Sequence, residues 1–372
     1  MSKSQKSSAW LILGLSLLPL TLVLQELAFR YPETTESVYG RWIYPKIAFL
    51  LSRVNTLATF SLAEGISILC IIFALIWTVK AILKMRQARH VALFRRLLRA
   101  AATVWIMCGI AAVTFLFLWG FNYARPSLAE RLNLSVTEVE AQEVLLVGKL
   151  SAEMASSLHC ALDIPPDRPT TLPIDLATLN DVIDRRLRAI ALPDDSIQYP
   201  TSPVKKLFIS RALCYMGISG IFVPFTGEPS MNALVPDVTI PLVVAHEKAH
   251  QRGITNEGEA NLAAFLACAG ANEYPYLRYS AYLLSAARLI GAASVYLPEE
   301  ARTLSKLLQA GPRSDLDGIR EFWDRYEGPL TKMAERANDT YLRSQRVPDG
   351  VESYGQVTLL LVALHRQGRF IQ

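Results

Sequence analysis

The segment Pro241-Leu-Val-Val-Ala-His-Glu-Lys-Ala-His-Gln-Arg-Gly253 combines a helix start, a metal-binding pattern and a helix end. Proline is favoured in the first turn of a helix, and glycine commonly follows the last turn. Residues four apart share one face of a helix, so His246 and His250 point the same way and can bind one metal ion, with Glu247 beside them. The apolar lead-in from 242 to 245 indicates a buried helix, where imidazoles need partners. The segment therefore predicts a Zn2+ site rather than an exposed helix face with two incidental histidines.

A third ligand is expected from the next helix, which opens with Asn256-Glu-Gly-Glu-Ala-Asn261. Glu257 and Asn261 share a face, so the Asn261 amide could orient a ligating group by hydrogen bonding. Glu259 lies three residues after Asn256, which is the spacing of a capping box and offers it a structural role. We therefore expect Glu257 to be the third ligand and keep Glu259 as the alternative.

The apolar residues are concentrated toward the N-terminal end of the chain. They make up 51% of all residues, and the mean hydropathy is +0.25. Stretches near 8–28, 62–83 and 100–122 can each supply the ~20 apolar residues that a membrane-spanning helix needs. We therefore expect a membrane region over 1–124 with three transmembrane helices, followed by a globular domain over 125–372.

Basic residues between the second and third stretches determine the expected orientation. Residues 80–99 include seven Lys or Arg and no Asp or Glu, so the positive-inside rule places this loop in the cytoplasm. Two crossings precede it, so the N-terminus is also expected in the cytoplasm, and the chain after about Asn122 outside a bacterial cytoplasmic membrane. The segment 29–63 would be an external loop. Glu64, at the end of a span, is expected at the interface rather than as a functional acid within the membrane.

The same basic loop accounts for the formal net charge of +5. No basic helix or aromatic-basic pattern remains elsewhere, so the expected partners include a lipid bilayer and exclude nucleic acid. Five cysteines without a Cys-x-x-Cys spacing do not form a disulfide scaffold. Cys160 and Cys214 could pair in an exported domain, but buried free thiols are the simpler expectation.

Mostly helical patterns occupy the region after the membrane segments. Ser135-Val-Thr-Glu138 has capping-box spacing ahead of a long amphipathic run. Arg288, at the centre of the apolar stretch 279–297, favours a globular helix over a fourth span. Ile221-Phe-Val-Pro-Phe225 is expected to be a short strand at an antiparallel edge. The expected fold class is therefore mainly α with a small β element. Further amphipathic helices are expected over 176–190, 279–296, 299–309, 319–343 and 354–366.

The stretch from Pro203 to Cys268 resembles the bacterial membrane family DUF3810, and a motif at the end of the third span extends the resemblance. The family is regarded as a group of candidate zinc metallopeptidases without an assigned substrate. The Glu-x-x-Ala-Asn pattern is also similar to an element of gluzincin peptidases in which the first Glu binds zinc. The motifs that carry the resemblance are Trp119-Gly-Phe-Asn-Tyr123, Pro224-Phe-Thr-Gly-Glu-Pro229, Asn232, Pro241, His246 to Gly253 and Glu257-Gly-Glu-Ala-Asn261.

This resemblance implies a zincin-like metallopeptidase domain after the three transmembrane helices. It makes Glu257 a zinc ligand and places Glu228 and Asn232 along the cleft. The spacing from His250 to Glu257 is shorter than in thermolysin-like enzymes, which keeps Glu259 open as the ligand.

The expected activity is hydrolysis of peptide bonds in a peptide or protein substrate. Zinc would activate a water, and Glu247 would accept its proton as general base and pass it to the leaving amine. Arg278, Tyr279 or Tyr282 has the right chemistry to stabilise the oxyanion, although each also suits a structural role. The alternative is a non-catalytic zinc-binding membrane sensor or scaffold. Structural zinc sites usually have four protein ligands and are rich in Cys, whereas two His and one Glu leave a position for water, so we favour the enzyme.

Overall fold

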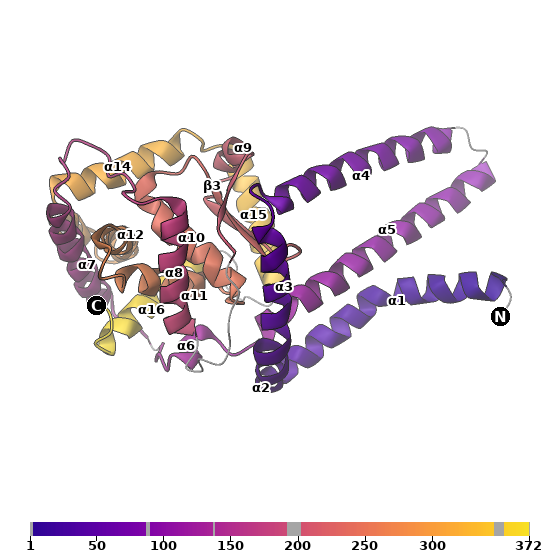
Figure 1. Cartoon of the computed structure of the whole chain (residues 1–372), viewed down its shortest axis with the longest axis horizontal. Helices are drawn as coiled ribbons and strands as arrows, with labels where there is room; N and C mark the ends of the chain where they lie inside the picture. The colour runs from indigo at the N-terminus through magenta and orange to yellow at the C-terminus, as the bar shows by residue number, and fades with distance from the viewer. Residues whose placement is uncertain (1–2, 87–89, 137, 192–201, 346–352, 372) are drawn as a thin grey trace.

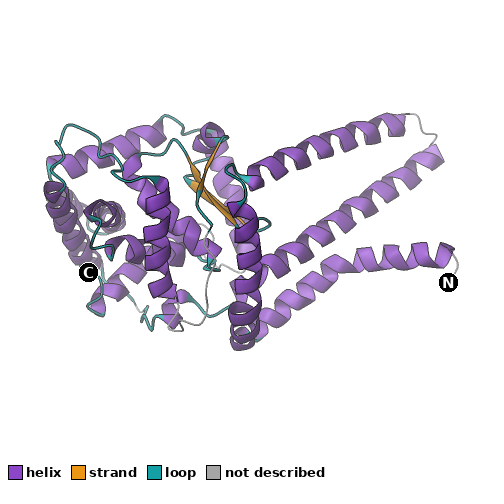
Figure 2. Ribbon diagram, viewed as in Figure 1, coloured by secondary structure: helices purple, strands orange, loops and turns teal. Residues whose placement is uncertain are grey.

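A computed structural model of the chain describes residues 3–86, 90–136, 138–191, 202–345 and 353–371. These residues are mainly helical, with one small sheet (Figure 2). The elements are α1 (Lys3–Arg30), α2 (Pro32–Thr34), η1 (Thr35–Ile43), α3 (Tyr44–Thr56), α4 (Leu62–Arg86), α5 (His90–Leu118), η2 (Gly120–Ala124), α6 (Leu128–Arg131), α7 (Ala141–Ala161), α8 (Leu176–Ala191), β1 (Lys205–Leu207), α9 (Ser210–Tyr215), β2 (Gly220–Val223), β3 (Glu228–Asn232), η3 (Asp237–Thr239), α10 (Ile240–Gln251), α11 (Glu257–Ala269), α12 (Pro275–Ser294), α13 (Pro298–Ser305), α14 (Ala310–Asp324), α15 (Pro329–Ser344) and α16 (Ser353–Arg366).

The helices α1, α4 and α5 project from one side of the globular part (Figure 1). Among the described residues, two stretches, Leu62–Leu83 and Arg96–Leu118, are long and apolar enough to cross a membrane. In the most apolar part of the first stretch, 0% of the residues are buried inside the protein, and in that of the second stretch 11% are buried. The core helix of a soluble protein would instead be mostly buried. Two helices rather than the expected three therefore meet this criterion.

The first expected span, 8–28, lies within the single helix α1. This helix carries Gln25, Glu26 and Arg30 toward its C-terminal end, and over the described residues it is not one of the two stretches that meet the criterion. The helix instead packs along α5. A Cβ at Gly14 would lie 2.9 Å from the Ile106 side chain, a close approach that small residues permit between helices.

The segment 29–63, expected to be a loop, is mostly helical. It contains α2, the π-helix η1 and α3, and α3 runs across the near ends of α1, α4 and α5 (Figure 1). Glu64, in the first turn of α4, is buried and accepts hydrogen bonds from the Phe208 and Ile209 amides at 3.1 and 2.7 Å. This carboxylate therefore joins α4 to the globular part.

The helix α11 forms the centre of the globular core. Nearly all of its residues are buried, and it packs against α8, α10, α12 and α16. The expected helix over 176–190 is confirmed as α8, and the one over 354–366 as α16.

Two helix boundaries differ from the expected ones. The capping box at Ser135 is not the start of α7, which begins at Ala141 behind a capping box of Glu140 and Glu143. The expected helix over 319–343 is divided into α14 and α15, because Pro329 cannot donate an i to i−4 hydrogen bond in a helix interior.

The sheet has the order β1-β3-β2, with β1 parallel and β2 antiparallel to β3. The strand expected at 221–225 is found as β2, paired so that Ile221 lies opposite Ser230. The central strand β3 is buried throughout, and α10 packs against both β2 and β3. The small sheet therefore lies directly over the helix that carries the histidine pair.

All five cysteines are free thiols in the structure. Cys214 is buried, as expected, whereas Cys160 is exposed and donates to the Gln309 side chain at 2.9 Å. The two do not form a disulfide.

Candidate metal centre

The helix α10 is held in place through the face opposite its histidines. The Lys248 Nζ lies 2.8 Å from one oxygen of Asp184, and an Arg252 nitrogen lies 2.7 Å from the other. The Gln251 amide donates to the Ser202 hydroxyl at 2.6 Å. Because buried charges are tolerated only when paired and hydrogen-bonded, this cluster fixes the rotation of α10 about its axis.

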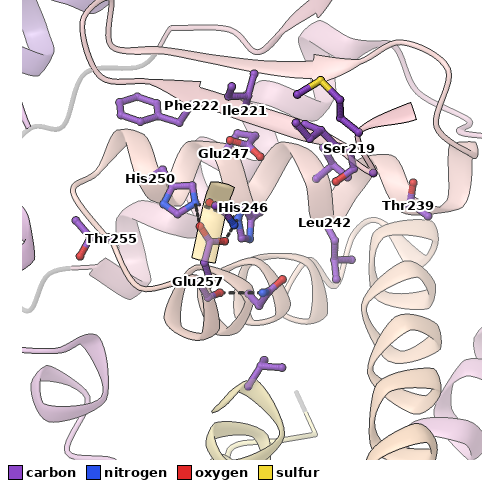
Figure 3. Close-up of a pocket in the computed structure, with 18 of the residues that line it drawn as sticks. Ser219, Ile221, Phe222, Thr239, Leu242, His246, Glu247, His250, Thr255 and Glu257 are labelled. Atoms are coloured by element: carbon purple, nitrogen blue, oxygen red, sulfur yellow. Dashed lines mark hydrogen bonds and ion pairs between the residues drawn. The ribbon is translucent and has the colours of Figure 1, made fainter. Parts of the chain in front are cut away.

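On the other face, His246, His250 and Glu257 converge from α10 and the start of α11 (Figure 3). The Nε2 atoms of the two imidazoles are 3.0 Å apart. The Glu257 carboxylate reaches both rings, with oxygens 3.2 Å from His246 Nε2 and 3.7 Å from His250 Nε2. One candidate ligand atom from each residue lies within 4.8 Å of the other two, so the three side chains could hold one cation.

The orientation of the His250 ring suits metal binding. Its Nδ1 lies 2.7 Å from the Ile254 carbonyl oxygen, so Nδ1 carries the proton and donates, which leaves the Nε2 lone pair facing His246 and Glu257. The Trp119 indole donates to the His250 carbonyl at 3.2 Å and so supports the backbone of the same turn.

Glu247 lies beside this cluster, between α10 and β2 (Figure 3). Its side chain is buried, and its Oε2 has no hydrogen-bond partner among the described residues. Gly220 of β2 makes this close approach possible, because a Cβ there would lie 2.5 Å from Glu247 Oε1. Burial raises the pKa of Glu247 to about 7, although His246 and His250 act in the opposite direction. A carboxyl group with a pKa near neutrality suits proton transfer in both directions.

The side chains of His250 and Glu257 shift each other's pKa values. Burial works against the charged form of His250, but the Glu257 carboxylate raises the pKa of this imidazole to about 9. The two imidazoles in turn lower the pKa of Glu257 against the effect of its own burial. The cluster therefore concentrates negative charge that a proton or a divalent cation can balance.

The cluster opens into a cavity of about 1250 Å³. Its walls include Trp119 and Tyr123 after α5, the strand β2, and Tyr341 of α15. The Tyr123 hydroxyl donates to the Tyr341 hydroxyl at 3.0 Å, and burial raises the pKa of Tyr341 to about 12. The cavity exceeds the usual range for drug-sized ligands and can accommodate several residues of a peptide.

Glu259 and Asn261 occupy different positions around the cluster. Asn261 lines the cavity and donates to the Glu257 carbonyl oxygen at 2.8 Å. Asn256 caps α11 by accepting from the Glu259 amide at 3.0 Å. The Glu259 carboxylate does not complete the capping box; it accepts from the Ala129 amide at 3.0 Å, at the start of α6. The structure thus brings Glu257, and not Glu259, to the two imidazoles.

Glu228 and Asn232 lie within the sheet rather than along the cavity. Glu228 is completely buried, accepts from the Leu62 amide at 3.0 Å and pairs with Lys205 at 3.1 Å. Asn232 is also completely buried, and its amide donates to the Cys214 sulfur at 3.2 Å. Both side chains hold β3 to its surroundings.

The three expected oxyanion donors make contacts away from the histidine pair. The Arg278 Nε donates to a carbonyl at the end of α11 at 3.2 Å. The Tyr279 hydroxyl donates to Asp315 at 2.6 Å, and the Tyr282 hydroxyl donates to the Phe370 carbonyl at 3.0 Å. None of the three lines the described cavity.

The sequence placed Trp119 and Tyr123 only in a motif at the end of the third expected span and did not connect them with the site. Tyr341 was not singled out at all. The only available signal was the motif Trp119 to Tyr123 at the end of an apolar stretch, which indicates an interface but not a contact with α10.

Comparison with known proteins identifies one relationship. The model of a family described as a protein of unknown function, DUF3810, matches residues 39–362. No curated protein and no solved structure matches the chain.

Proposed function

Because the chain belongs to the DUF3810 family, whose function is unknown, we propose a function from the site itself: the protein is a membrane-anchored zinc metallopeptidase. The observation that carries the proposal is the convergence of His246, His250 and Glu257, with the buried carboxylate of Glu247 beside them. Two imidazoles and one carboxylate are a common ligand set of catalytic zinc, and they leave room for water and substrate.

The residues present fit a zinc ion. The Nε2 atoms of the two imidazoles lie 3.0 Å apart, a distance that requires a proton or a cation between or beside them, because two unprotonated nitrogens would repel. A bound zinc ion would lower the pKa of water and polarise a substrate carbonyl.

The remaining chemistry belongs to the chain. His246, His250 and Glu257 would hold the ion, and the Ile254 carbonyl accepts from His250 Nδ1 and so fixes the tautomer of this ring. Glu247 accepts a proton from the attacking water and delivers it to the leaving nitrogen. The Tyr123 and Tyr341 hydroxyls face the same cavity and are candidates to stabilise the oxyanion, in place of the three residues held elsewhere.

The membrane arrangement is part of the proposal. The start of α4 and the end of α5 both meet the globular part, and the opposite ends of the two helices, where their sequences carry basic residues, point away from it (Figure 1). With the basic segment 80–99 in the cytoplasm, the globular part lies outside, and α1 returns the N-terminus to the cytoplasmic side as a third span.

The full-length protein in vesicles provides the test, with zinc content and cleavage of an unfolded protein such as casein as the two readouts. His246→Ala should remove both zinc and activity, whereas His365→Ala, a histidine away from the cavity, should keep both. Glu247→Gln should retain about one zinc per chain and lose activity, with Glu300→Gln as the matched exposed control. Zinc binding without activity in the wild type would favour the sensor or scaffold, and absence of zinc from the wild type would refute the proposed site.

A further inference from the structure

The histidine cluster lies directly beside the end of an apolar helix. The stretch that is long enough to cross a membrane ends at Leu118, and the next residue, Trp119, donates to the His250 carbonyl at 3.2 Å. The Trp119 and His250 ring centroids are 6.3 Å apart. Phe115, within the apolar stretch itself, lines the same cavity as His246. The cluster is therefore about one side chain away from the end of the hydrocarbon-spanning segment.

The rim of the cavity is apolar and partly open to solvent. Met216, Ile221 and Phe225 each line the cavity while more than a third of each remains exposed. The ring of Phe225 lies 6.3 Å from that of Phe115, centroid to centroid, so the rim is continuous with the apolar helix. Large exposed apolar side chains around a cavity mark a surface that meets an apolar partner.

The helix α3 carries a second exposed apolar surface, close to the end of α5 and to the rim of the cavity. Its inner face is fixed to the globular part, since the Tyr44 hydroxyl donates to the Gln251 carbonyl at 2.8 Å and the Asn55 amide to the Thr226 carbonyl at 2.7 Å. Its outer face carries exposed apolar residues at helical spacing, and Figure 1 shows α3 running across the ends of α1, α4 and α5. The exposed apolar residues of this face, including the end of η1 and the residue after α3, are Trp42, Phe49, Leu50, Val54 and Leu57.

Two basic side chains lie on this outer face over aromatic rings. Lys46 Nζ is 5.7 Å from the centroid of Trp42, and the Arg53 guanidinium is 5.1 Å from that of Phe49. Aromatic and apolar groups interleaved with cations are typical of helices that lie in the headgroup region of anionic membranes. The face thus places the bilayer surface next to the loop that carries Phe225.

We propose that the substrates are polypeptides anchored in the same bilayer, cut at a peptide bond within the headgroup region, close to the point where the chain leaves the hydrocarbon core. The inference rests on the proposed peptidase function and adds the class of substrate. A chain that emerges beside α5 reaches the cavity directly, over the apolar rim of Met216, Ile221 and Phe225. A soluble peptide has to enter the same cavity through the headgroups.

Chain geometry gives the expected position of the cut. An extended chain advances about 3.3–3.6 Å per residue, and the headgroup region on one side of a bilayer is about 5–8 Å thick. About two extended residues therefore cross this region, and a chain that runs obliquely and bends into the cavity needs about twice as many, so the cut should fall within about five residues of the end of the anchor. Confinement of enzyme and substrate to one bilayer also raises their effective concentration, so anchored peptides should be cut at least about 10-fold faster than free ones at micromolar bulk concentration.

The test uses the full-length protein in vesicles of phosphatidylcholine with one quarter phosphatidylglycerol. The probes are unstructured peptides of randomised sequence, each prepared free and with a hydrophobic 20-residue transmembrane anchor at its C-terminus, and mass spectrometry locates the cuts. We expect anchored peptides to be cut at least about 10-fold faster, within about five residues of the anchor, and Glu247→Gln to abolish the cuts.

Two results would contradict the inference in different ways. Cleavage that depends on Glu247 but is equally fast for free peptides, or spread evenly along the anchored ones, would overturn the membrane-surface substrate and leave the peptidase function standing. No Glu247-dependent cleavage of either probe or of casein, by the zinc-loaded protein, would overturn both.

Discussion

Gly220 offers the sharpest test of how Glu247 is positioned. A Cβ at this residue would lie 2.5 Å from Glu247 Oε1, 2.8 Å from its Cγ and 2.9 Å from its Cδ. Ordinary van der Waals contact at such positions begins at about 3.4 Å, so in Gly220→Ala either the carboxylate or β2 must move by up to about 1 Å. A misplacement of that size at a reacting group costs on the order of 100-fold in rate.

We therefore expect Gly220→Ala to lower kcat/KM about 100-fold while zinc content stays near one per chain, because the three atoms nearest the new methyl group all belong to Glu247 and not to a proposed ligand. The overpacked site should also lose about 1–3 kcal/mol of stability. Gly318→Ala is the matched control, since nothing lies within 4 Å of a Cβ there. Steady-state kinetics would measure kcat/KM, and metal analysis would measure the zinc content, of both variants and of the wild type. A Gly220→Ala protein with unchanged kcat/KM would refute the placement of Glu247 against β2.

Three further predictions follow from the site and the membrane arrangement. Glu257→Gln should weaken zinc binding at least about 10-fold in a chelator competition, because an amide oxygen is a poor ligand. Glu259→Gln should leave zinc binding near the wild-type value. If Glu259→Gln weakened zinc binding and Glu257→Gln did not, Glu259 would be the ligand. In the metal-free protein the pKa of His250 is raised from 6.5 to about 9, so its contribution to stability is complete below pH 6.5 and is lost as the pH rises through 9. The melting temperature in chelator should therefore fall more between pH 6.5 and 9 in the wild type than in His250→Ala, and equal slopes would contradict the coupling to Glu257. Reporter fusions after residue 89 should be cytoplasmic and fusions after Leu134 external, and the opposite result would place the globular part inside the cell.

The convergence of His246, His250 and Glu257 illustrates what local sequence can predict. His246 and His250 are one helical turn apart, and Glu257 follows a short connection, so their approach depends on backbone geometry over twelve residues. The helix α8 and the strand β2 were likewise predictable, because their apolar patterns are regular over their own length. Mainly helical structure was correctly expected on this basis, and the family was correctly expected from the resemblance of its motifs.

Other parts of the site depend on contacts between residues far apart in the chain. Trp119 contacts α10 across 131 residues, and Tyr123 meets Tyr341 across 218. Glu228 stood in a motif of the family, yet its partner is the start of α4, 166 residues earlier. The apolar residues along α3 have helical spacing, but the position of 29–63 between two expected spans led to the expectation of a loop. Pairings of this kind cannot be derived from a single sequence, because many polar groups could have satisfied each one.

Two buried carboxylates join α4 to the sheet, one from each side, and this has a consequence for the order in which the chain folds. Glu228 of β3 binds the backbone at the start of α4, while Glu64 of α4 binds the backbone after β1, and both carboxylates are buried. A fragment beginning at residue 125 would expose these groups without their partners, together with the surfaces of α10 that Tyr44 and Trp119 cover. Because α4 and α5 are synthesised before the globular elements that they contact, we expect the globular part to complete its packing against a hairpin that already exists. If the hairpin is placed in a bilayer, as we propose, we expect the cluster of His246, His250 and Glu257 to be completed only at the membrane, after insertion.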